Sequence, residues 1–224
     1  TESVVLDLCC GTGAVAAGLA QYCKAIEAVD GAPEMIALAQ PDRRVSYHLL
    51  DIDSPAFVEW MRGRTFDLIT IGMGVHWLGE AVLEGLRRNL KPGGRIAILA
   101  TGISGPSYNP WFADFHRVRG ALTQPERRDW TGEAQLSALG YFRADLLEKT
   151  YRGKVSPTDL VNHLLSFSAE AQIVSKNYDA VLAAVEKALN PYLSNGWIDC
   201  CWTSSARLFV DQKSTAIPLS TQSP

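Results

Sequence analysis

Three aspartates stand at regular intervals in the first quarter of the chain, each within or directly after a short apolar run. They are Asp7, Asp30 and Asp51, at spacings of 23 and 21 residues. A carboxylate accepts hydrogen bonds from hydroxyl and amino groups, and a buried one is costly without a partner. The pattern therefore predicts a site for a polar or cationic ligand.

A glycine-rich loop follows the first of these aspartates. Gly11-Thr12-Gly13 separates the apolar run that contains Asp7 from a segment with helical periodicity. Glycine lacks Cβ, so a ligand can approach the backbone closely, and the N–H groups at the start of a helix can meet an anionic group. Strand, glycine turn and helix together indicate a ligand-binding unit.

The elements that must hold these residues are alternating strands and helices. Alternation at this length predicts a parallel sheet with helices on both faces, an α/β, doubly wound and mostly parallel seven-stranded sheet. The three aspartates would then share the carboxyl edge, where ligands bind in open sheets. The expected strands cover 4–8, 25–29, 45–50, 66–72, 95–100, 146–155 and 198–210. The expected helices cover 14–22, 34–39, 55–61, 79–89, 111–122, 133–140, 157–167 and 178–192, and 91–94 is expected to be a tight turn.

The chain length favours one domain, over 1–224. Within it we expect a cofactor-binding half over 1–101, a lid insertion over 102–145 that is partly helical, and a substrate-side half over 146–224. Asn109-Pro110-Trp111 is interpreted as a turn inside the lid.

Composition narrows the function classes. A hydrophobic content of 47% with 20% charged residues fits a folded globular protein, and a net charge of −3 disfavours nucleic acid as the main partner. No apolar run is long enough for a membrane span. Five cysteines without C-x-x-C spacing indicate no metal site and reduced thiols in a cytoplasmic protein. No signal peptide is visible, and the chain starts directly in its first strand, which leaves open a segment before it.

The order of these motifs resembles the class I S-adenosylmethionine-dependent methyltransferases. Three further pieces match: Phe66-Asp67-Leu68-Ile69 opens the fourth strand, His76-Trp77 follows it, and Leu90 to Arg95 precedes the fifth. The His-Trp pair is similar to that of small-molecule methyltransferases such as those acting on trans-aconitate. The chain departs from the family at Cys9, where a glycine is expected.

The resemblance implies the Rossmann-like methyltransferase fold, S-adenosylmethionine as cofactor, and a role for each site residue. Asp30 would accept both ribose hydroxyls and Asp51 the adenine amino group. Asp7 would face the amino end of the methionine part, directly or through water. Other implied cofactor contacts are Gly11 and Gly13 against the methionine part, Met35 and the Ile52 backbone at the adenine, the Gly72 backbone at the amino acid end, and Thr12, Gly31 and Met73 beside them.

The residues for catalysis and substrate binding leave alternatives open. His76 is either a general base or a ring that packs beside Trp77. His116, in the lid, is either a base or a surface histidine. Asp53, which competes with Asp51, is interpreted as the cap of the helix that begins at Pro55. The expected substrate-pocket walls, which ordinary lid packing would also explain, are Trp77, Tyr108, Trp111 and Phe115.

The sequence thus favours an enzyme that transfers a methyl group from S-adenosylmethionine to an oxygen, nitrogen or carbon of a small organic molecule. One alternative is an NAD(P)-dependent oxidoreductase, although Ala16 occupies the third glycine position of that fingerprint. Another is a methyltransferase-fold protein with a non-methylating role, such as a cyclase. The substrate and the oligomeric state stay open.

Overall fold

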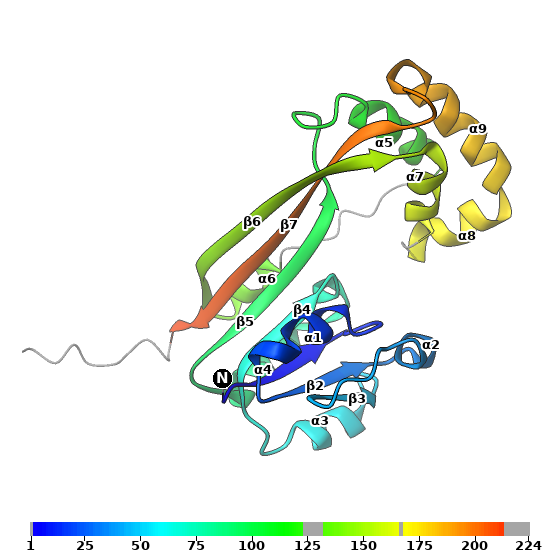
Figure 1. Cartoon of the computed structure of the whole chain (residues 1–224). Coiled ribbons are helices and arrows are strands. Elements are labelled where there is room, and N and C mark those ends of the chain that lie inside the picture. Colours follow the sequence, from blue (N-terminus) through cyan, green and yellow to red (C-terminus); the bar gives the residue numbers. More distant parts are fainter. Residues whose placement is uncertain (1, 123–131, 166–167, 213–224) are drawn as a thin grey trace, which may run out of the picture. The chain divides into compact units, whose positions relative to one another are not determined.

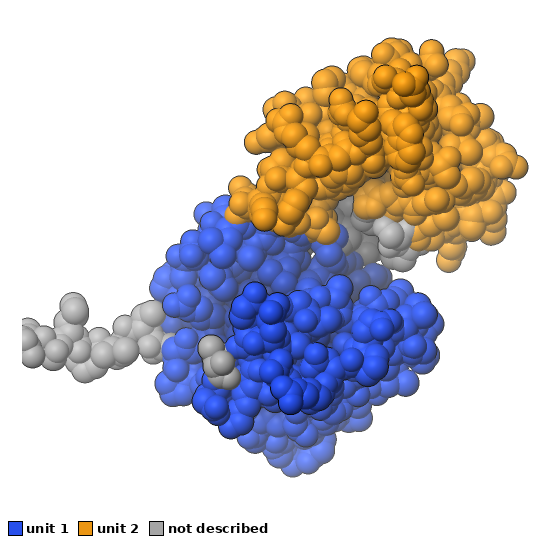
Figure 2. Space-filling model, in the orientation of Figure 1, with its two compact units in different colours: residues 1–100, 128–147, 205–224 blue, residues 101–127, 148–204 orange. Residues whose placement is uncertain are grey.

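The computed structural model describes residues 2–122, 132–165 and 168–212. The chain divides into two compact units (Figures 1 and 2): unit 1 comprises 1–100, 128–147 and 205–224, and unit 2 comprises 101–127 and 148–204. Three long strands contribute residues to both units.

A seven-stranded sheet in the order β3-β2-β1-β4-β5-β7-β6 organises the chain. The pairs β1–β2, β1–β4, β2–β3 and β4–β5 are parallel, and flanking helices complete the predicted α/β class, which is confirmed. The strands are β1 Val4–Leu8, β2 Ala25–Asp30, β3 Val45–Leu49, β4 Phe66–Gly72, β5 Leu90–Ile103, β6 Tyr141–Val155 and β7 Ile198–Asp211.

The helices of unit 1 begin where the sequence provides start signals. Pro33 occupies the first turn of α2, and Pro55 that of α3, positions at which proline loses no hydrogen bond. The helices are α1 Ala14–Leu19, α2 Pro33–Ala37, α3 Pro55–Met61, α4 Glu80–Leu86 and α6 Glu133–Ala138, with 3-10 turns η1 Ala20–Tyr22, η2 Val75–Trp77 and η3 Arg87–Asn89.

The core of unit 1 explains the continuous apolar runs of the central strands. Leu6 and Leu8 of β1, Ile69 and Ile71 of β4, and Ile96 of β5 have no exposed surface. Strands of a parallel sheet are covered on both faces, so successive side chains are buried rather than alternating with polar ones.

Two local expectations were wrong. Ser54, not Asp53, is the N-cap of α3, because the Ser54 side chain accepts a hydrogen bond from the Phe57 N–H at 3.2 Å. The segment 91–94 is not a separate turn but part of β5, where the register slips: Phe66 pairs with Leu90, and Leu68 already pairs with Arg95. The extra residues form a bulge, which lets the strand continue.

Unit 2 contains helices packed against the remaining parts of β5, β6 and β7. Helix α5 confirms the predicted helical segment after the fifth strand, whereas α8 was not predicted and α7 ends earlier than expected, with 166–167 outside the described residues. Its helices are α5 Phe112–Leu122, α7 Pro157–Leu164, α8 Ser168–Lys176 and α9 Tyr178–Leu189, with the 3-10 turn η4 Asn190–Tyr192. The capping box of Ser156 and Asp159 starts α7.

Within the described ranges, the helices are all too short or too polar to cross a membrane.

Candidate functional site

The three predicted aspartates lie at the carboxyl ends of adjacent strands, as expected. Asp7 is in β1, Asp30 ends β2, and Asp51 follows β3. Because β1 pairs with β2 and β2 with β3 in parallel, these ends share one edge of the sheet in unit 1. The three carboxylates differ sharply in exposure, and each therefore has a different role available to it.

Asp7 is completely buried, with 0% of its surface exposed. The Thr70 hydroxyl, opposite it on β4, donates a hydrogen bond of 2.6 Å to Asp7 Oδ1. Burial raises the pKa of the Asp7 carboxyl to about 6, and the Thr70 hydroxyl and the backbone N–H of Ala16 lower it only in part. Asp7 thus links β1 to β4 and acts on the first turn of α1.

The glycine loop has the conformation that only glycine adopts without strain. Gly11 and Gly13 have φ values of 55° and 79°. A Cβ on Gly13 would lie 2.3 Å from the hydroxyl oxygen of Tyr47, whereas a Cβ on Gly11 would have no described atom within 4 Å. Gly13 is needed for close packing against β3, and Gly11 leaves one face of the loop backbone open to a ligand.

Asp30 joins this loop to the end of β2. Its Oδ2 accepts a hydrogen bond of 2.8 Å from the Gly11 N–H, and its Oδ1 accepts one of 2.9 Å from the Ala32 N–H. The two backbone donors hold the half-buried carboxylate in one orientation. Each oxygen keeps a further lone pair, so the group can still accept from two ligand hydroxyls.

The end of β3 lies directly beside this carboxylate. The backbone N–H of Leu50 donates to the Asp30 carbonyl at 2.9 Å, and a Cβ on Gly31 would lie 3.6 Å from Asp51 Cα. Asp51 is exposed and accepts a hydrogen bond from the Asp53 backbone N–H at 3.0 Å. Ile52 packs against the core, while Met35 on α2 is an exposed apolar side chain.

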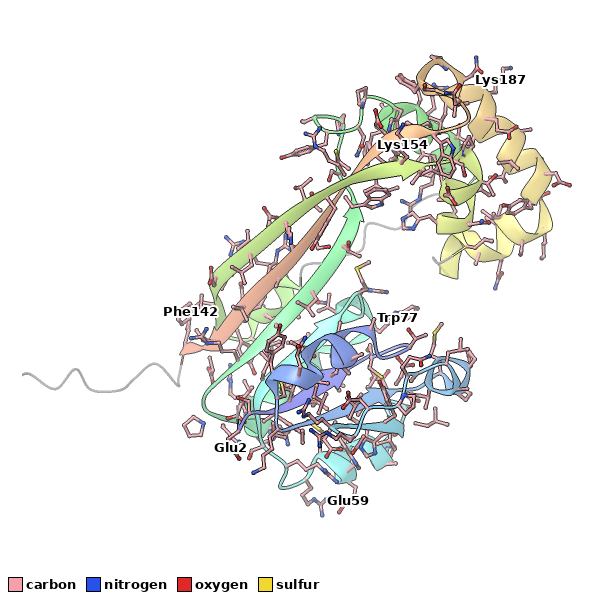
Figure 3. All side chains as sticks on the ribbon, viewed as in Figure 1. Glu2, Glu59, Trp77, Phe142, Lys154 and Lys187 are labelled. Atoms are coloured by element: carbon pink, nitrogen blue, oxygen red, sulfur yellow. The ribbon has the colours of Figure 1, made fainter. Side chains whose placement is uncertain are left out.

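The loop after β4 contains the predicted His-Trp pair. Met73 follows Gly72 with φ 55°, and its N–H donates to the Leu99 carbonyl at 2.9 Å. The rings of His76 and Trp77 in η2 lie 4.8 Å apart at a tilt of 45°. Trp77, labelled in Figure 3, is 54% exposed. The structure therefore brings this pair to the carboxyl end of β4, next to β1 in the sheet.

Cys9, at which the sequence departs from the family glycine, has a backbone conformation that the sequence alone did not indicate. It has φ 54°, a left-handed conformation that is uncommon outside glycine. Burial, together with Asp30, Asp7 and Asp53, raises the pKa of the thiol to about 12. Its position at the expected family glycine was the available signal, because a glycine in such a loop is often there for its backbone conformation.

The predicted aromatic lid residues belong to unit 2. Trp111 and Phe115 are buried in its core, and the Trp111 indole Nε1–H donates to the Asp199 carbonyl at 2.9 Å. His116 packs its ring 4.1 Å from that of Phe112, and burial lowers the pKa of the imidazole. Tyr108 is exposed. Their contribution to substrate binding or catalysis stays a prediction.

Asn109 explains the turn that precedes α5. It is completely buried, and both ends of its amide are hydrogen-bonded to backbone. Its Nδ2 donates to the carbonyls of Ser104 and Cys201, at 2.6 and 3.0 Å, and its Oδ1 accepts from the Cys201 N–H at 2.8 Å. Asn109 thus ties the turn to β7 and has a structural role.

The fold and this edge of the sheet define a class I methyltransferase architecture. Residues 5–94 match a family model described as a methyltransferase domain. A demethylmenaquinone methyltransferase of Lactiplantibacillus plantarum is 35% identical over 105 residues, which are 43% of this chain and 44% of the relative. One from Leptospira interrogans is 32% identical over 124 residues, 50% of this chain and 48% of the relative. The chain spans less than half of the length of these relatives.

Solved structures agree on the fold. A candidate type II methyltransferase from Anaeromyxobacter dehalogenans has a TM-score of 0.66 at 18% identity, covering 93% of this chain and 89% of that one. A methyltransferase from Geobacter sulfurreducens in complex with S-adenosylhomocysteine has a TM-score of 0.52 at 14% identity, covering 94% and 85%. Residues 5–94 are thus similar to a methyltransferase domain, and the fold that the sequence resemblance implied is confirmed.

Proposed function

We propose that the protein transfers the methyl group of S-adenosylmethionine to an oxygen, nitrogen or carbon atom of a small organic molecule. The observation that carries the proposal is Asp30, a carboxylate fixed by the Gly11 and Ala32 N–H groups at the end of β2. The methyltransferase-domain match and the named relatives support the same activity.

The residues at this edge fit the cofactor. The position of a Cβ on Gly11 is free of described atoms within 4 Å, which leaves the loop backbone accessible to the methionine part. Asp30 is oriented to accept the ribose hydroxyls, and the exposed Asp51 stands one strand further, beside Gly31, for the adenine amino group. Thr12, Met35, Ile52, Gly72 and Met73 complete the proposed set.

The bound cofactor would supply an electrophilic methyl group on its sulfonium. The task of the chain is then to hold the acceptor atom in line with that group and to exclude water, and positioning of this kind can account for much of a rate enhancement. His76 would remove a proton where the acceptor is not already ionised. Trp77, which is exposed beside His76, is the proposed substrate contact of unit 1, whereas Trp111 and Phe115 are buried in the core of unit 2.

Asp7 fits an indirect role better than direct contact with the cofactor. Its carboxylate has no exposed surface, and it acts on β4 through Thr70 and on α1 through the Ala16 N–H. We propose that Asp7 acts indirectly, by holding β1, which leads into the glycine loop, against Thr70 of β4.

Titration calorimetry with S-adenosylmethionine and S-adenosylhomocysteine tests the proposal. We expect Asp30→Ala to weaken both affinities by about tenfold to a hundredfold, the effect of losing hydrogen bonds to a charged group. Asp53→Ala, which removes an exposed carboxylate two residues from Asp51, is the matched control and should bind normally. Absence of binding to the wild-type protein, or binding of NADH or NADPH in its place, would reject the proposal.

A further inference from the structure

Cys9 carries a side chain at a backbone position that disfavours one. Its φ of 54° lies in the left-handed region, where a residue with a Cβ is strained. Strain of this kind persists only where the surrounding structure enforces it, and it gathers at functional sites. Cys9 lies between Asp7 and Gly11, in the loop that the proposed function assigns to the cofactor.

Gly74 is the reverse case: it is a glycine at a backbone position that does not require one. Its φ of −117° and ψ of −3° are open to residues with a side chain, so its backbone does not require glycine. A Cβ on Gly74 would lie 2.5 Å from Cys9 Cβ, which is closer than atoms can pack, and 3.1 Å from Cys9 Sγ, which is a tight contact. The side chain of Cys9 therefore occupies the space that a side chain on Gly74 would need.

The contact joins two loops with different tasks. The Gly74 carbonyl accepts a hydrogen bond of 2.9 Å from the Trp77 N–H and so begins the turn η2. Cys9 Sγ lies 4.0 Å from the same carbonyl oxygen, a weak thiol hydrogen bond. The cysteine thus contacts the residue from which the His76-Trp77 turn starts.

Reactive thiol chemistry does not explain this cysteine. A thiol attacks or ligates as the thiolate, and burial together with three nearby carboxylates keeps the Cys9 thiol protonated at neutral pH. The properties of Cys9 that can matter are therefore the volume of its side chain and its weak hydrogen bond to the Gly74 carbonyl.

We propose that Cys9 is a positioning residue whose side chain fills the space between the glycine loop and Gly74 and so fixes the spacing of the cofactor loop and the His76-Trp77 turn. The inference rests on the proposed function, because the spacing matters through the cofactor that both loops would contact. Removing the side chain leaves the turn to be ordered on binding, at a cost in affinity.

A double-mutant cycle of Cys9→Gly and Gly74→Ala tests the steric part by thermal unfolding. In the wild-type background, Gly74→Ala overpacks the contact and should lower Tm by about 3 to 10 °C. In the Cys9→Gly background the same change meets no obstacle and should leave Tm unchanged or raise it. Equal effects of Gly74→Ala in both backgrounds would overturn the proposal.

Calorimetric affinity for S-adenosylhomocysteine tests the positioning part. Cys9→Gly should weaken binding by about threefold to tenfold, and the double variant should recover it, because a methyl group then fills the same space from the other loop. Matched controls are Asn195→Gly, which relieves a left-handed residue of unit 2 with φ 52°, and Gly79→Ala, whose Cβ would have no described neighbour within 4 Å.

Two outcomes separate this inference from the proposed function. Unchanged affinity in Cys9→Gly, with a reversed stability effect of Gly74→Ala, would reduce Cys9 to a packing residue and overturn its positioning role. Failure of the wild-type protein to bind S-adenosylmethionine or S-adenosylhomocysteine would reject the proposed function and the positioning role together, whatever the stability cycle shows.

Discussion

Asp7 shows how burial alone changes the chemistry of a single residue. Its pKa rises from 3.8 to about 6, with desolvation as the main cause. Between these values the folded protein binds more protons than the unfolded chain, so the free energy of unfolding falls as pH rises through this range. About two pKa units correspond to about 3 kcal/mol.

Replacing Asp7 by asparagine tests the free-energy cost of burying the ionised Asp7 carboxylate. The variant cannot ionise at position 7, so its stability should not fall between pH 4 and 7 from this source. Relative to wild type, the free energy of unfolding of Asp7→Asn should therefore rise by about 2 to 2.5 kcal/mol across that range. Urea unfolding at several pH values measures the difference, and two parallel pH profiles would contradict it.

The two glycines of the loop differ in what surrounds them, which gives a second prediction. Both have positive φ, so alanine strains either backbone, but only a Cβ on Gly13 would lie 2.3 to 2.8 Å from the Tyr47 side chain. Gly13→Ala should destabilise the protein by about 1 to 3 kcal/mol more than Gly11→Ala, the cost of overpacking. Urea unfolding compares the two, and Tyr47→Ala should relieve the Gly13→Ala defect but not that of Gly11→Ala.

At the scale of helices and strands, Ser54 and its neighbour Asp53 should contribute differently to stability, because only Ser54 caps α3. Ser54→Ala removes the acceptor for the Phe57 N–H and should cost about 1 kcal/mol in the free energy of unfolding. Asp53→Ala should change it by less than about 0.5 kcal/mol, since the Asp53 side chain is exposed and Ser54, not Asp53, caps the helix. Chemical denaturation of both variants checks the assignment, and a larger loss in Asp53→Ala would contradict it.

The central elements could be predicted from the sequence because their signals are local. The runs Val4–Leu8 and Phe66–Gly72 are mostly apolar, and they match β1 and β4. The bulge near Gly93 could not be predicted, because a Lys-Pro-Gly-Gly sequence favours a turn and only the pairing with β4 shows that the strand passes through it. Helix α8 was not predicted.

Part of the candidate site could also be predicted from local sequence signals. Asp30 and Asp51 end strands, and their place on one edge follows from parallel topology. The burial of Asp7 against Thr70 and the contact between Cys9 and Gly74 join residues more than sixty positions apart. The sequence pattern within one segment does not indicate which side chains from two distant segments will be in contact.

On the scale of the whole chain, the two compact units draw on segments that are distant in sequence. The division into 1–101, 102–145 and 146–224 follows chain order, whereas unit 1 also takes in 128–147 and 205–224. The order β5-β7-β6 brings these segments to one sheet. Long-range strand pairing of this kind carries no local sequence signal.

Arg87 connects all three segments of unit 1. Its guanidinium lies 2.9 Å from the buried Asp211 carboxylate, 5.0 Å from the centre of the Tyr141 ring, and hydrogen-bonds the Leu139 carbonyl. Removing one partner leaves the other charge buried without compensation, which typically costs about 3 to 5 kcal/mol, whereas replacing both by apolar residues costs less. The pair thus couples η3 to the ends of β6 and β7.

We therefore expect Asp211→Leu and Arg87→Leu each to lower the free energy of unfolding by about 3 kcal/mol, and the double variant to lose much less than the sum. Urea unfolding of the four proteins in the cycle measures the coupling. Arg88→Leu, one residue away, is the matched control and should have little effect. If the losses are additive in the double variant, each residue stabilises unit 1 separately, and Arg87 does so through Leu139 and Tyr141. The ion pair would then not hold the three segments together.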